Sequence, residues 1–412
     1  MKTVDGRDVR IIDPGLMNDD AGPDFFNATV QIGNETWVGN IEIHIKASDW
    51  YRHRHQHDRA YDSVILHVVQ TDDMPVTRPD GSTIPQITIQ CTAKAIETCR
   101  QLIANSAHSL PCHNTIRNIA GIYITDWLTA LAYERLYAKS DRLTALTNAH
   151  RGDWAQAAFT TLARALGFGL NSQPFEQLAA STPLACMRKH ADDQDACEAI
   201  IFGQAGLIPA PSHDEHAYTS ALRENYMFLA NKFGLKCTQP AFKMGRTRPQ
   251  NLPYKRLAYL AQFACYSDCF IEELETARTL DDMRRVFDHP LIGFWATHYT
   301  FSPTSADRAS KAFGAASLDK LLVNVAIPLL HARATARGDL DRATLVAQLY
   351  ETIGPEENRL TVPFSRAGIK NDSAFTSQAL IHLRQEYCSR NKCIYCRFGH
   401  RMLSAQFRND QP

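Results

Sequence analysis

The sequence predicts an α+β protein, in which a small N-terminal mixed-sheet α/β domain, residues 1–110, precedes a larger all-α domain, residues 111–412. Apolar residues alternate with period two up to about Gln90, which is typical of half-buried strands. Long segments with helical periodicity follow Pro111. The chain of 412 residues also exceeds the roughly 250–300 residues at which a single hydrophobic core stops growing. Two domains therefore account for the pattern best.

Strands are expected only in the first domain. Alternating residues predict strands at 25–32, 36–45, 63–69 and 84–90, with Gly33-Asn34 as the turn between the first two, and helices at 48–61 and 92–107. In the second domain the period of 3.6 residues predicts helices and almost no strand. These helices are expected at 125–139, 154–166, 217–233, 253–264, 318–334 and 377–389.

The charges of the chain balance. Lys and Arg total 44, as do Asp and Glu, so no overall field draws the molecule to nucleic acid or to a membrane, and any such contact must be local. No run of about 18 apolar residues stands out, and we expect no membrane partner. The sequence has no Walker-type loop, no Gly-x-Gly-x-x-Gly after a strand and no Gly-x-Ser-x-Gly elbow. ATP hydrolysis, Rossmann redox chemistry and serine esterase chemistry are therefore unsupported.

Cysteine usage indicates a reducing compartment. The N-terminus lacks the apolar core of a secretion signal, and the 11 cysteines are an odd number in a long chain. We therefore expect free thiols in a cytoplasmic setting, where they serve as small core residues or as metal ligands. The sequence predicts no particular oligomeric state.

A group of polar side chains on the predicted hairpin forms the first candidate site. Side chains alternate along a strand, so Glu42, His44 and Lys46 share one face of segment 36–45. If the hairpin closes at Gly33-Asn34, Asp24 lies opposite Glu42–Ile43. Carboxylates about 4 Å apart repel by roughly 4 kcal/mol at an effective dielectric of 20, so converging acids favour a divalent ion such as Mg²⁺. Lys46 would then orient the attacking water. The alternative is a polar face that is merely solvated.

Histidines are concentrated just after this strand. His53, His55, His57 and Asp58 follow closely, and His67 lies on the next predicted strand. A spacing of two residues makes it unfavourable for all three of the first histidines to bind one ion. A His-rich metallohydrolase acting on a small phosphorylated molecule, with His53, His57, Asp58 and His67 in its site, is one alternative function.

The hairpin motif resembles the PD-(D/E)XK superfamily of metal-dependent nucleases. The matching residues are Pro23-Asp24, His44 at the acid position, and Lys46. The resemblance implies a restriction-endonuclease-like domain, a metal-binding Asp24 and a catalytic Lys46, with Mg²⁺ or Mn²⁺ as the ion. His44 departs from the superfamily pattern of Asp or Glu, so Glu42 is a candidate replacement acid. Ligation by His44 itself would favour Mn²⁺ or Zn²⁺.

A second resemblance spans nearly the whole chain. Segments such as NDDAGPDFFNA, WVGNIEIHIKASDW, RPQNLPYKRLAYLA and SAFTSQALIHLRQEYC occur in order, and together they resemble a large bacterial family known only as a domain of unknown function. Membership of this family implies no activity.

The C-terminal cysteines form a second candidate site. Cys388, Cys393 and Cys396, followed by His400, supply four ligands with the Cys-x2-Cys spacing of structural zinc sites. The nuclease resemblance implies instead an iron–sulfur cluster, with Cys112 as the fourth ligand. Reduced thiols packed as small apolar residues are the alternative.

The segment 384–408 is also basic. Arg390, Lys392, Arg397 and Arg401 alternate with aromatic residues, a composition that favours contact with a phosphate backbone and with bases. A solvated basic tail is the alternative reading.

Together these features predict a metal-dependent phosphodiesterase, nuclease-like, acting on DNA or RNA. The main alternative is a non-catalytic nucleic-acid-binding or scaffolding protein on a degenerate nuclease fold, a reading that His44 in the acid position favours.

Overall fold

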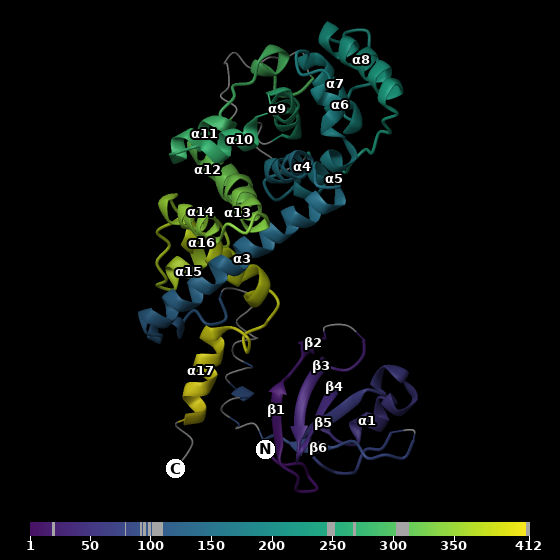
Figure 1. Cartoon of the computed structure of the whole chain (residues 1–412), viewed down its shortest axis with the longest axis vertical. Coiled ribbons are helices and arrows are strands. Elements are labelled where there is room, and N and C mark those ends of the chain that lie inside the picture. The colour runs from purple at the N-terminus through teal and green to yellow at the C-terminus, as the bar shows by residue number, and fades with distance from the viewer. Residues whose placement is uncertain are drawn as a thin grey trace. The chain divides into compact units, whose positions relative to one another are not determined.

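In the computed structural model the chain forms two compact units, an N-terminal unit of residues 1–104 with 401–412 and a helical unit of residues 105–400. The structure describes residues 1–18, 21–78, 80–90, 93, 96–97, 100, 110–244, 252–266, 269–301 and 313–408. The observed architecture confirms the α+β prediction, a mixed sheet followed by a mostly helical region (Figure 1). The predicted boundary near residue 110 stays a prediction, because residues 101–109 lie outside the described part of the chain.

The N-terminal unit is built on a mixed sheet. Five strands lie in the order β1 (Val9–Asp13), β3 (Phe25–Ile32), β4 (Glu35–Lys46), β5 (Val64–Thr71) and β6 (Gln86–Thr88), and β2 (Leu16–Met17) pairs with β3. The β1–β3 and β3–β4 pairs are antiparallel, whereas β4–β5 and β5–β6 are parallel. Antiparallel neighbours need only a short turn, but parallel neighbours need a crossover. The crossover between β4 and β5 is the His-rich segment.

The predicted hairpin forms as expected. Gly33 at its turn has a φ of 60°, a conformation that glycine adopts without a steric penalty. Ile32 then pairs with Glu35, and the register continues to Ala28 opposite Gly39. Gly39 also permits a close approach of β4 to β5, because a Cβ atom there would lie 2.5 Å from Cγ2 of Ile65.

The predicted single helix over 48–61 is wrong. A short helix α1 (Asp49–Arg52) is followed by two 3₁₀ turns, η1 (His55–His57) and η2 (Arg59–Tyr61). Arg54, which lies between α1 and η1, has a left-handed φ of 62°. An α-helix does not accommodate this conformation. The strand expected at 84–90 shortens to β6, and the helix expected at 92–107 falls mostly outside the described residues.

Each face of the sheet has its own apolar cluster. One comprises Val30, Ile41 and Val68 among others, and the other joins the crossover to the sheet through Trp50 and Tyr61. The crossover thus covers the face of β4 that carries Glu42 and His44.

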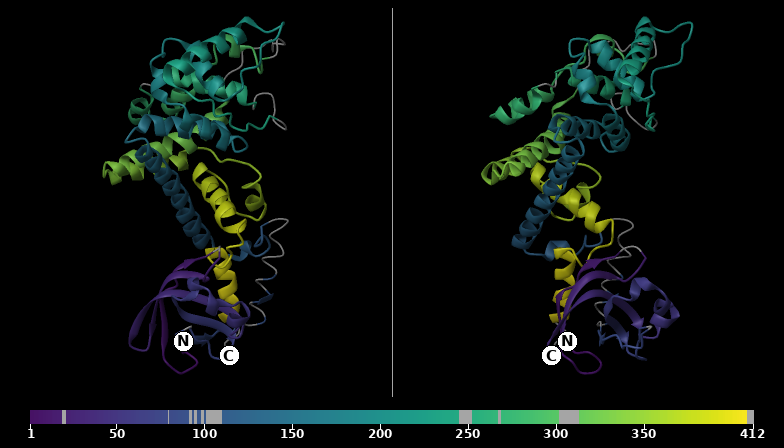
Figure 2. Two further views of the ribbon diagram at one scale, coloured as in Figure 1. Left: turned by 90° about the vertical axis from the view of Figure 1, so that its right-hand side faces the viewer. Right: turned by 45° about the vertical axis from the view of Figure 1, so that its right-hand side comes forward.

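The helical unit contains no strand in its described residues. Its long helix α3 (Gly121–Ala149) packs beside α13 (Ile327–Ala336) and α16 (Ala374–His382) (Figures 1 and 2). The predicted helices at 154–166 and 217–233 are confirmed without change, while α3 is longer than predicted. The other helices are α4 (Trp154–Leu166), α5 (Ser172–Ser181), α6 (Leu184–Arg188), α7 (Gln194–Gln204), α8 (Ala217–Phe233), α9 (Pro253–Tyr266), α10 (Phe270–Thr276), α11 (Leu280–Phe287), α12 (Ala315–Leu321), α13 (Ile327–Ala336), α14 (Leu340–Thr352), α15 (Val362–Arg366), α16 (Ala374–His382) and α17 (Arg397–Arg408).

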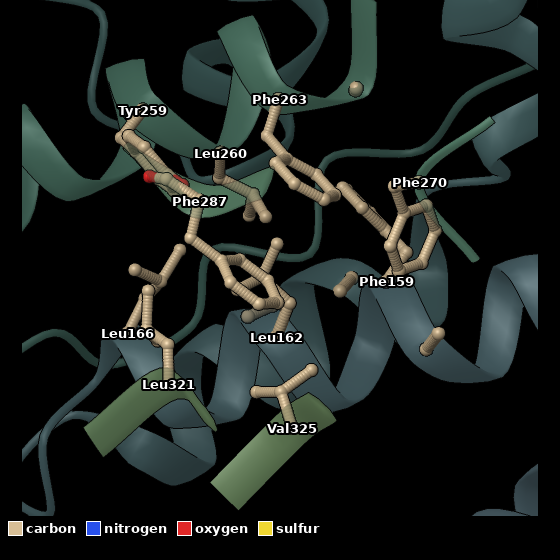
Figure 3. Close-up of a cluster of buried hydrophobic side chains, with 14 of the residues drawn as sticks. Phe159, Leu162, Leu166, Tyr259, Leu260, Phe263, Phe270, Phe287, Leu321 and Val325 are labelled. Atoms are coloured by element: carbon tan, nitrogen blue, oxygen red, sulfur yellow. The ribbon is translucent and has the colours of Figure 1, made fainter. Parts of the chain in front are cut away.

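Helices from distant parts of the sequence share one apolar core (Figure 3). Phe159 and Leu162 of α4 meet Phe263 of α9 and Phe287 of α11, and all four side chains are at most 2% exposed. The Phe263 and Phe287 rings stack with centroids 6.0 Å apart. Burying several large side chains in this way supplies the main favourable free energy of folding in this unit.

Two π-helical segments interrupt otherwise regular helices. η6 (Leu322–Ala326) joins α12 to α13, and η7 (Leu383–Cys388) extends α16. Pro328 follows η6, and a proline in a helix clashes with the preceding turn and removes a hydrogen bond, a disturbance that wider helical turns absorb.

The run Ala315–Ala336 that contains η6 is the one described helix long and apolar enough, by length and composition, to cross a membrane; 67% of its most apolar window is buried inside the structure. Such burial is typical of a core helix.

Candidate metal centre

Glu42 and His44 face the crossover on β4, and they are buried rather than solvated. Their exposed fractions are 5% and 9%. His67 of β5, the residue that pairs with Glu42 of β4, is fully buried. On the opposite face, Ile43 and Ile45 are 46% and 67% exposed. The reading of a merely solvated polar face is therefore wrong for Glu42 and His44, because the crossover covers this side of the sheet.

Aromatic rings of the crossover enclose the histidines. The His55 ring stacks on Tyr61 with centroids 3.8 Å apart, and Trp50 contacts His55 and His67 edge-on at 5.4 and 5.5 Å. Trp50 and Tyr61 were not among the sequence-based candidates. The sequence did contain a clue to their role, because these two aromatic residues lie on either side of the His-rich segment.

The carboxylate and three imidazoles converge. Glu42 Oε1 lies 3.3 Å from His44 Nε2 and 3.4 Å from His55 Nε2, and His44 Nε2 lies 3.2 Å from His53 Nδ1. The donor atoms of the three histidines all lie within 4.8 Å of one another. Ligands 2.0–2.1 Å from a tetrahedral ion are about 3.3–3.4 Å apart, so the measured separations have the size of a metal's ligand shell. We call these four residues the Glu–His cluster.

Burial shifts the pKa values of the ionisable groups in the cluster. Burial, and secondarily the charge of Asp24, raises the pKa of Glu42 to about 8. Burial and the neighbouring histidines lower the pKa of His44 to about 4, and burial also lowers that of His55. Neutral imidazoles offer their lone pairs to a metal. A buried carboxyl beside them is satisfied by a proton or by a cation.

A second layer of contacts orients the cluster. His44 Nδ1 lies 2.9 Å from His67 Nε2, so that His44 presents its Nε2 atom to Glu42 and His53. Metal-binding histidines commonly use the second ring nitrogen in this way. Nε2 of His55 is buried and makes no hydrogen bond among the described residues, because its 3.4 Å contact with Glu42 Oε1 lacks hydrogen-bond geometry. Such an atom is suited to bind an ion.

Asp24 lies where the hairpin register predicted, opposite Glu42–Ile43. Its backbone N–H donates to Glu42 Oε2 at 3.1 Å, and its Oδ2 accepts from the backbone N–H of Ile43 at 2.9 Å. A β-bulge between Phe25 and Ala28 directly follows Asp24 in the chain, and bulges often re-aim side chains beside sites. Asp24 therefore fixes Glu42 and adds negative charge beside it.

Other predicted residues lie apart from the cluster. The Lys46 side chain is exposed, and its charge acts on Asp73. His57 is exposed, and the Asp58 side chain caps η2 by accepting from the backbone N–H of Ala60 at 2.9 Å. The structure thus joins His53 and His55 with Glu42 and His44, a combination that spacing alone did not predict.

The C-terminal cysteines also gather in the helical unit. Burial, and secondarily the nearby thiols of Cys396 and Cys393, raises the pKa of Cys112 to about 12. The same causes, with Cys112 among them, raise the pKa of Cys388. His400 is exposed. The structure therefore brings Cys112 to the three C-terminal cysteines, and this group is called the four-thiol cluster.

The four-thiol cluster is wider than the Glu–His cluster. Among the described residues, His44, His53 and His55 form the one group of three possible ligands whose donor atoms all lie within 4.8 Å of one another. The thiols do not meet this distance. Thiolates around one zinc ion, 2.3 Å from it, would be about 3.8 Å apart. All nine described cysteines are free thiols.

The basic residues of segment 384–408 do not form one free patch. Arg390 pairs with Glu386 at 2.9 Å, and Arg397 pairs with Asp126 and lies 4.8 Å over the Trp127 ring. Lys392 lines a cavity of the helical unit, and Arg401 belongs to the residues grouped with the N-terminal unit. Their predicted contact with nucleic acid stays a prediction.

Fold and site together define an α+β protein with a candidate transition-metal centre in its sheet unit. The chain belongs to a family described as a protein of unknown function, DUF2851, whose model matches residues 1–359. This confirms the family resemblance seen in the sequence. Searches of curated proteins and of solved structures found no match, so the resemblance to PD-(D/E)XK nucleases remains a hypothesis.

Proposed function

We propose that the protein is a metal-dependent phosphodiesterase acting on nucleic acid, with its ion held by Glu42, His44, His53 and His55. The convergence of a carboxylate oxygen and imidazole nitrogens at separations of 3.2–3.4 Å carries the proposal. Three nitrogen donors favour Zn²⁺ or Mn²⁺ over Mg²⁺. When bound, such an ion polarises a phosphoryl oxygen and lowers the pKa of an attacking water.

The residues around the ligands have separate tasks in this proposal. Asp24 holds Glu42 through its backbone N–H, and His67 holds His44. His53 is the exposed ligand, and it lies between Arg52 and Arg54, which are exposed as well. Guanidinium groups at this position would bind the phosphates that flank the bond to be cleaved. Lys46, two residues beyond His44 on β4, would neutralise the negative charge that develops on the phosphoryl group during cleavage.

Metal binding and cleavage test the proposal in the full chain. We expect wild type to bind one Zn²⁺ or Mn²⁺ at this site by calorimetry, and Glu42→Gln and His53→Ala to weaken that binding at least tenfold. His57→Ala is the matched control, because His57 is an exposed neighbour outside the cluster. Equal affinity in all four proteins would refute the site.

Substrate arms separate the alternatives. Single- and double-stranded DNA and RNA are compared with bis(p-nitrophenyl) phosphate in wild type, Asp24→Ala and Lys46→Ala. Cleavage of the polymers that falls in both variants supports the proposal. Cleavage of the small ester alone would favour the small-molecule metallohydrolase, which the histidine content of the site also supports. Metal binding without any cleavage would favour the degenerate, non-catalytic protein.

We further propose that Cys112, Cys388, Cys393 and Cys396 hold a metal cofactor, zinc or an iron–sulfur cluster. Four thiols from two distant segments gather there, with Cys388 and Cys396 each 8% exposed. The wider spacing of the thiols supports the iron–sulfur alternative.

Elemental and acid-labile sulfide analysis of protein purified without oxygen distinguishes these cofactors. Cys388→Ser is expected to lose the metal, while Cys237→Ser, an exposed thiol elsewhere in the unit, keeps it. Metal-free wild type would contradict the proposal.

A further inference from the structure

A large cavity lies within the helical unit. Its volume is about 1170 Å³, and eight cationic side chains but only three carboxylates line it. Its walls come from α3, α4, α16 and η7, together with the loop after α14. An excess of positive charge in a concave site is the electrostatic pattern that attracts an anion.

Internal ion pairs do not cancel this charge. Glu176 pairs with both Arg142 and Arg164. Lys320 pairs with Glu356 at 3.2 Å, and Arg390 pairs with Glu386 at 2.9 Å. By contrast, no carboxylate of the described residues lies within ion-pair distance of Arg135 or Lys139. These two cations are neighbours on one face of α3, because they are four residues apart.

Arg135 and Lys139 are held by neutral groups instead. Lys139 Nζ donates to the carbonyl of Val323 at 3.1 Å, to Asn324 Oδ1 at 2.9 Å and to Gln378 Oε1 at 2.7 Å. Arg135 donates Nε to the same Gln378 oxygen at 2.7 Å and an Nη atom to Gln385 at 3.0 Å. These contacts occupy all three N–H donors of the ammonium but only two of the five of the guanidinium.

The π-helical segments help to build the cavity. The Val323 carbonyl and Asn324 belong to η6, and Gln385 belongs to η7. A π turn releases backbone groups from the regular helical ladder, and such turns are frequent at functional sites. The Val323 carbonyl accepts hydrogen bonds from both Lys139 and Tyr350. Both helices thus depart from regular geometry beside these two cations.

We propose that this cavity binds a phosphate-bearing ligand of the nucleotide type, with Arg135 hydrogen-bonding the phosphate and Lys139 holding Gln378 and Asn324 in place behind it. Guanidinium groups match phosphate oxygens in geometry. Phe168, Tyr387 and Tyr395 also line the cavity, and aromatic rings stack on bases. A free nucleotide and a nucleic-acid strand share this chemistry. The proposal goes beyond the proposed phosphodiesterase function and does not depend on the Glu–His cluster.

Calorimetry on the full chain at low salt tests the proposal with three probes: inorganic pyrophosphate, AMP and a short oligo-dT. At least one is expected to bind with a Kd below about 100 µM, a binding free energy of about −5.5 kcal/mol or better. Binding of AMP or pyrophosphate assigns a free ligand, whereas binding of oligo-dT alone assigns a strand. Failure of all three to bind overturns the proposal.

Variants locate the binding. Gln378→Glu places a carboxylate against both buried cations and is expected to weaken binding at least tenfold. Gln348→Glu is the matched control, since Gln348 is exposed on α14 outside the cavity, and it should stay within twofold of wild type. Equal weakening by both variants would show general surface attraction and overturn the site.

Two further tests keep the result decisive. If Gln378→Glu does not fold, Arg359→Ala replaces it, because Arg359 is an exposed cavity residue, and at least threefold weakening is expected; no weakening overturns the proposal. Wild type in EDTA, where no divalent ion occupies the Glu–His cluster, should bind the probe as strongly as it does without EDTA. Loss of binding in EDTA would assign the probe to the Glu–His cluster and overturn the cavity site, whereas failure of the phosphodiesterase proposal leaves this result unchanged.

Discussion

The two units bury ionisable groups of opposite type, an acid in the N-terminal unit and bases in the helical unit. In the N-terminal unit, the carboxylate of Glu42 lies against His44 and His55, whose pKa values are lowered by burial. In the helical unit, Arg135 and Lys139 lie against the oxygens of amides. In both units, the buried ionisable groups therefore have neutral side chains as neighbours. The comparison supports the proposals of a cation at the first site and of an anion at the second.

The physical reason lies in desolvation. Moving a charge out of water has an effective cost of several kcal/mol, and a single partner of opposite charge offsets it only when geometry is favourable. Where the chain supplies no such partner, the charged group changes its protonation state or binds a ligand. Tests that change the protonation or the partners of buried charges therefore sharpen the comparison.

The largest effect is expected at Glu198, a buried acid of the helical unit whose hydrogen-bond partners among the described residues are neutral groups. The Tyr218 hydroxyl and the Gln194 amide donate to its carboxyl group, and burial raises its pKa from 4.5 to about 7. Since the folded state binds this proton more tightly than the unfolded state, stability is lost as pH rises from 4.5 through 7. The loss is roughly 3 kcal/mol.

Urea unfolding of wild type and Glu198→Gln at pH 5 and pH 8 measures this loss. The variant should show a flatter pH dependence, because glutamine keeps an acceptor for Tyr218 without a charge. Glu272→Gln changes an exposed acid and should retain the wild-type slope. The explanation fails if Glu198→Gln retains that slope too.

The next effect is expected at His67, which orients a proposed ligand without touching the ion. His67→Phe keeps a planar aromatic ring at this fully buried position but removes the contact with His44 Nδ1. Loss of such a second-layer contact lowers metal affinity about 10–100-fold. Competition with a chromogenic zinc chelator measures it, and His57→Phe serves as the exposed control. An unchanged zinc affinity would show that His44 needs no such support.

The smallest effect is expected where the helical unit holds another buried cation. The Arg256 guanidinium lies 3.7 Å over the Phe168 ring and donates to the Leu166 carbonyl at 3.0 Å. Burial lowers the pKa of Arg256 to about 10. Phe168→Leu removes the cation–π contact, which is worth about 1–2 kcal/mol when desolvated. Urea unfolding at pH 7 is the measurement.

An exposed cation–π pair supplies the matched control for this variant. Phe228 is 66% exposed and lies 5.9 Å from Lys232 Nζ, so Phe228→Leu should cost less than half as much stability. Equal losses in the two variants would show that burial of the Arg256 contact adds nothing.

Hairpin pairing was predictable because it is local. Gly33 and the alternation around it set the register, and that register places Asp24 opposite Glu42–Ile43 as predicted. Which face would be buried was not predictable. Ile43 is exposed and His44 buried because a crossover, with its helix broken at Arg54, folds onto the polar side.

Long-range gatherings were harder to predict. Cys112 and Cys388 are far apart in the chain, and spacing alone indicated His400 as the nearer fourth ligand. On α3 the sequence did carry a signal, since Arg135, Lys139 and Arg142 recur at helical spacing on one face. That pattern did not predict Gln378 as the hydrogen-bond partner of Arg135 and Lys139.

The sequence by itself determined the strand and helix types and the hairpin register, since side-chain periodicity and turn geometry act over a few residues. Only the tertiary structure decided that His53 and His55 join Glu42, that Cys112 joins the C-terminal thiols, and that α3 presents its cations to α16. Such meetings depend on how whole elements pack, and packing is decided by the summed burial of many side chains rather than by any local pattern.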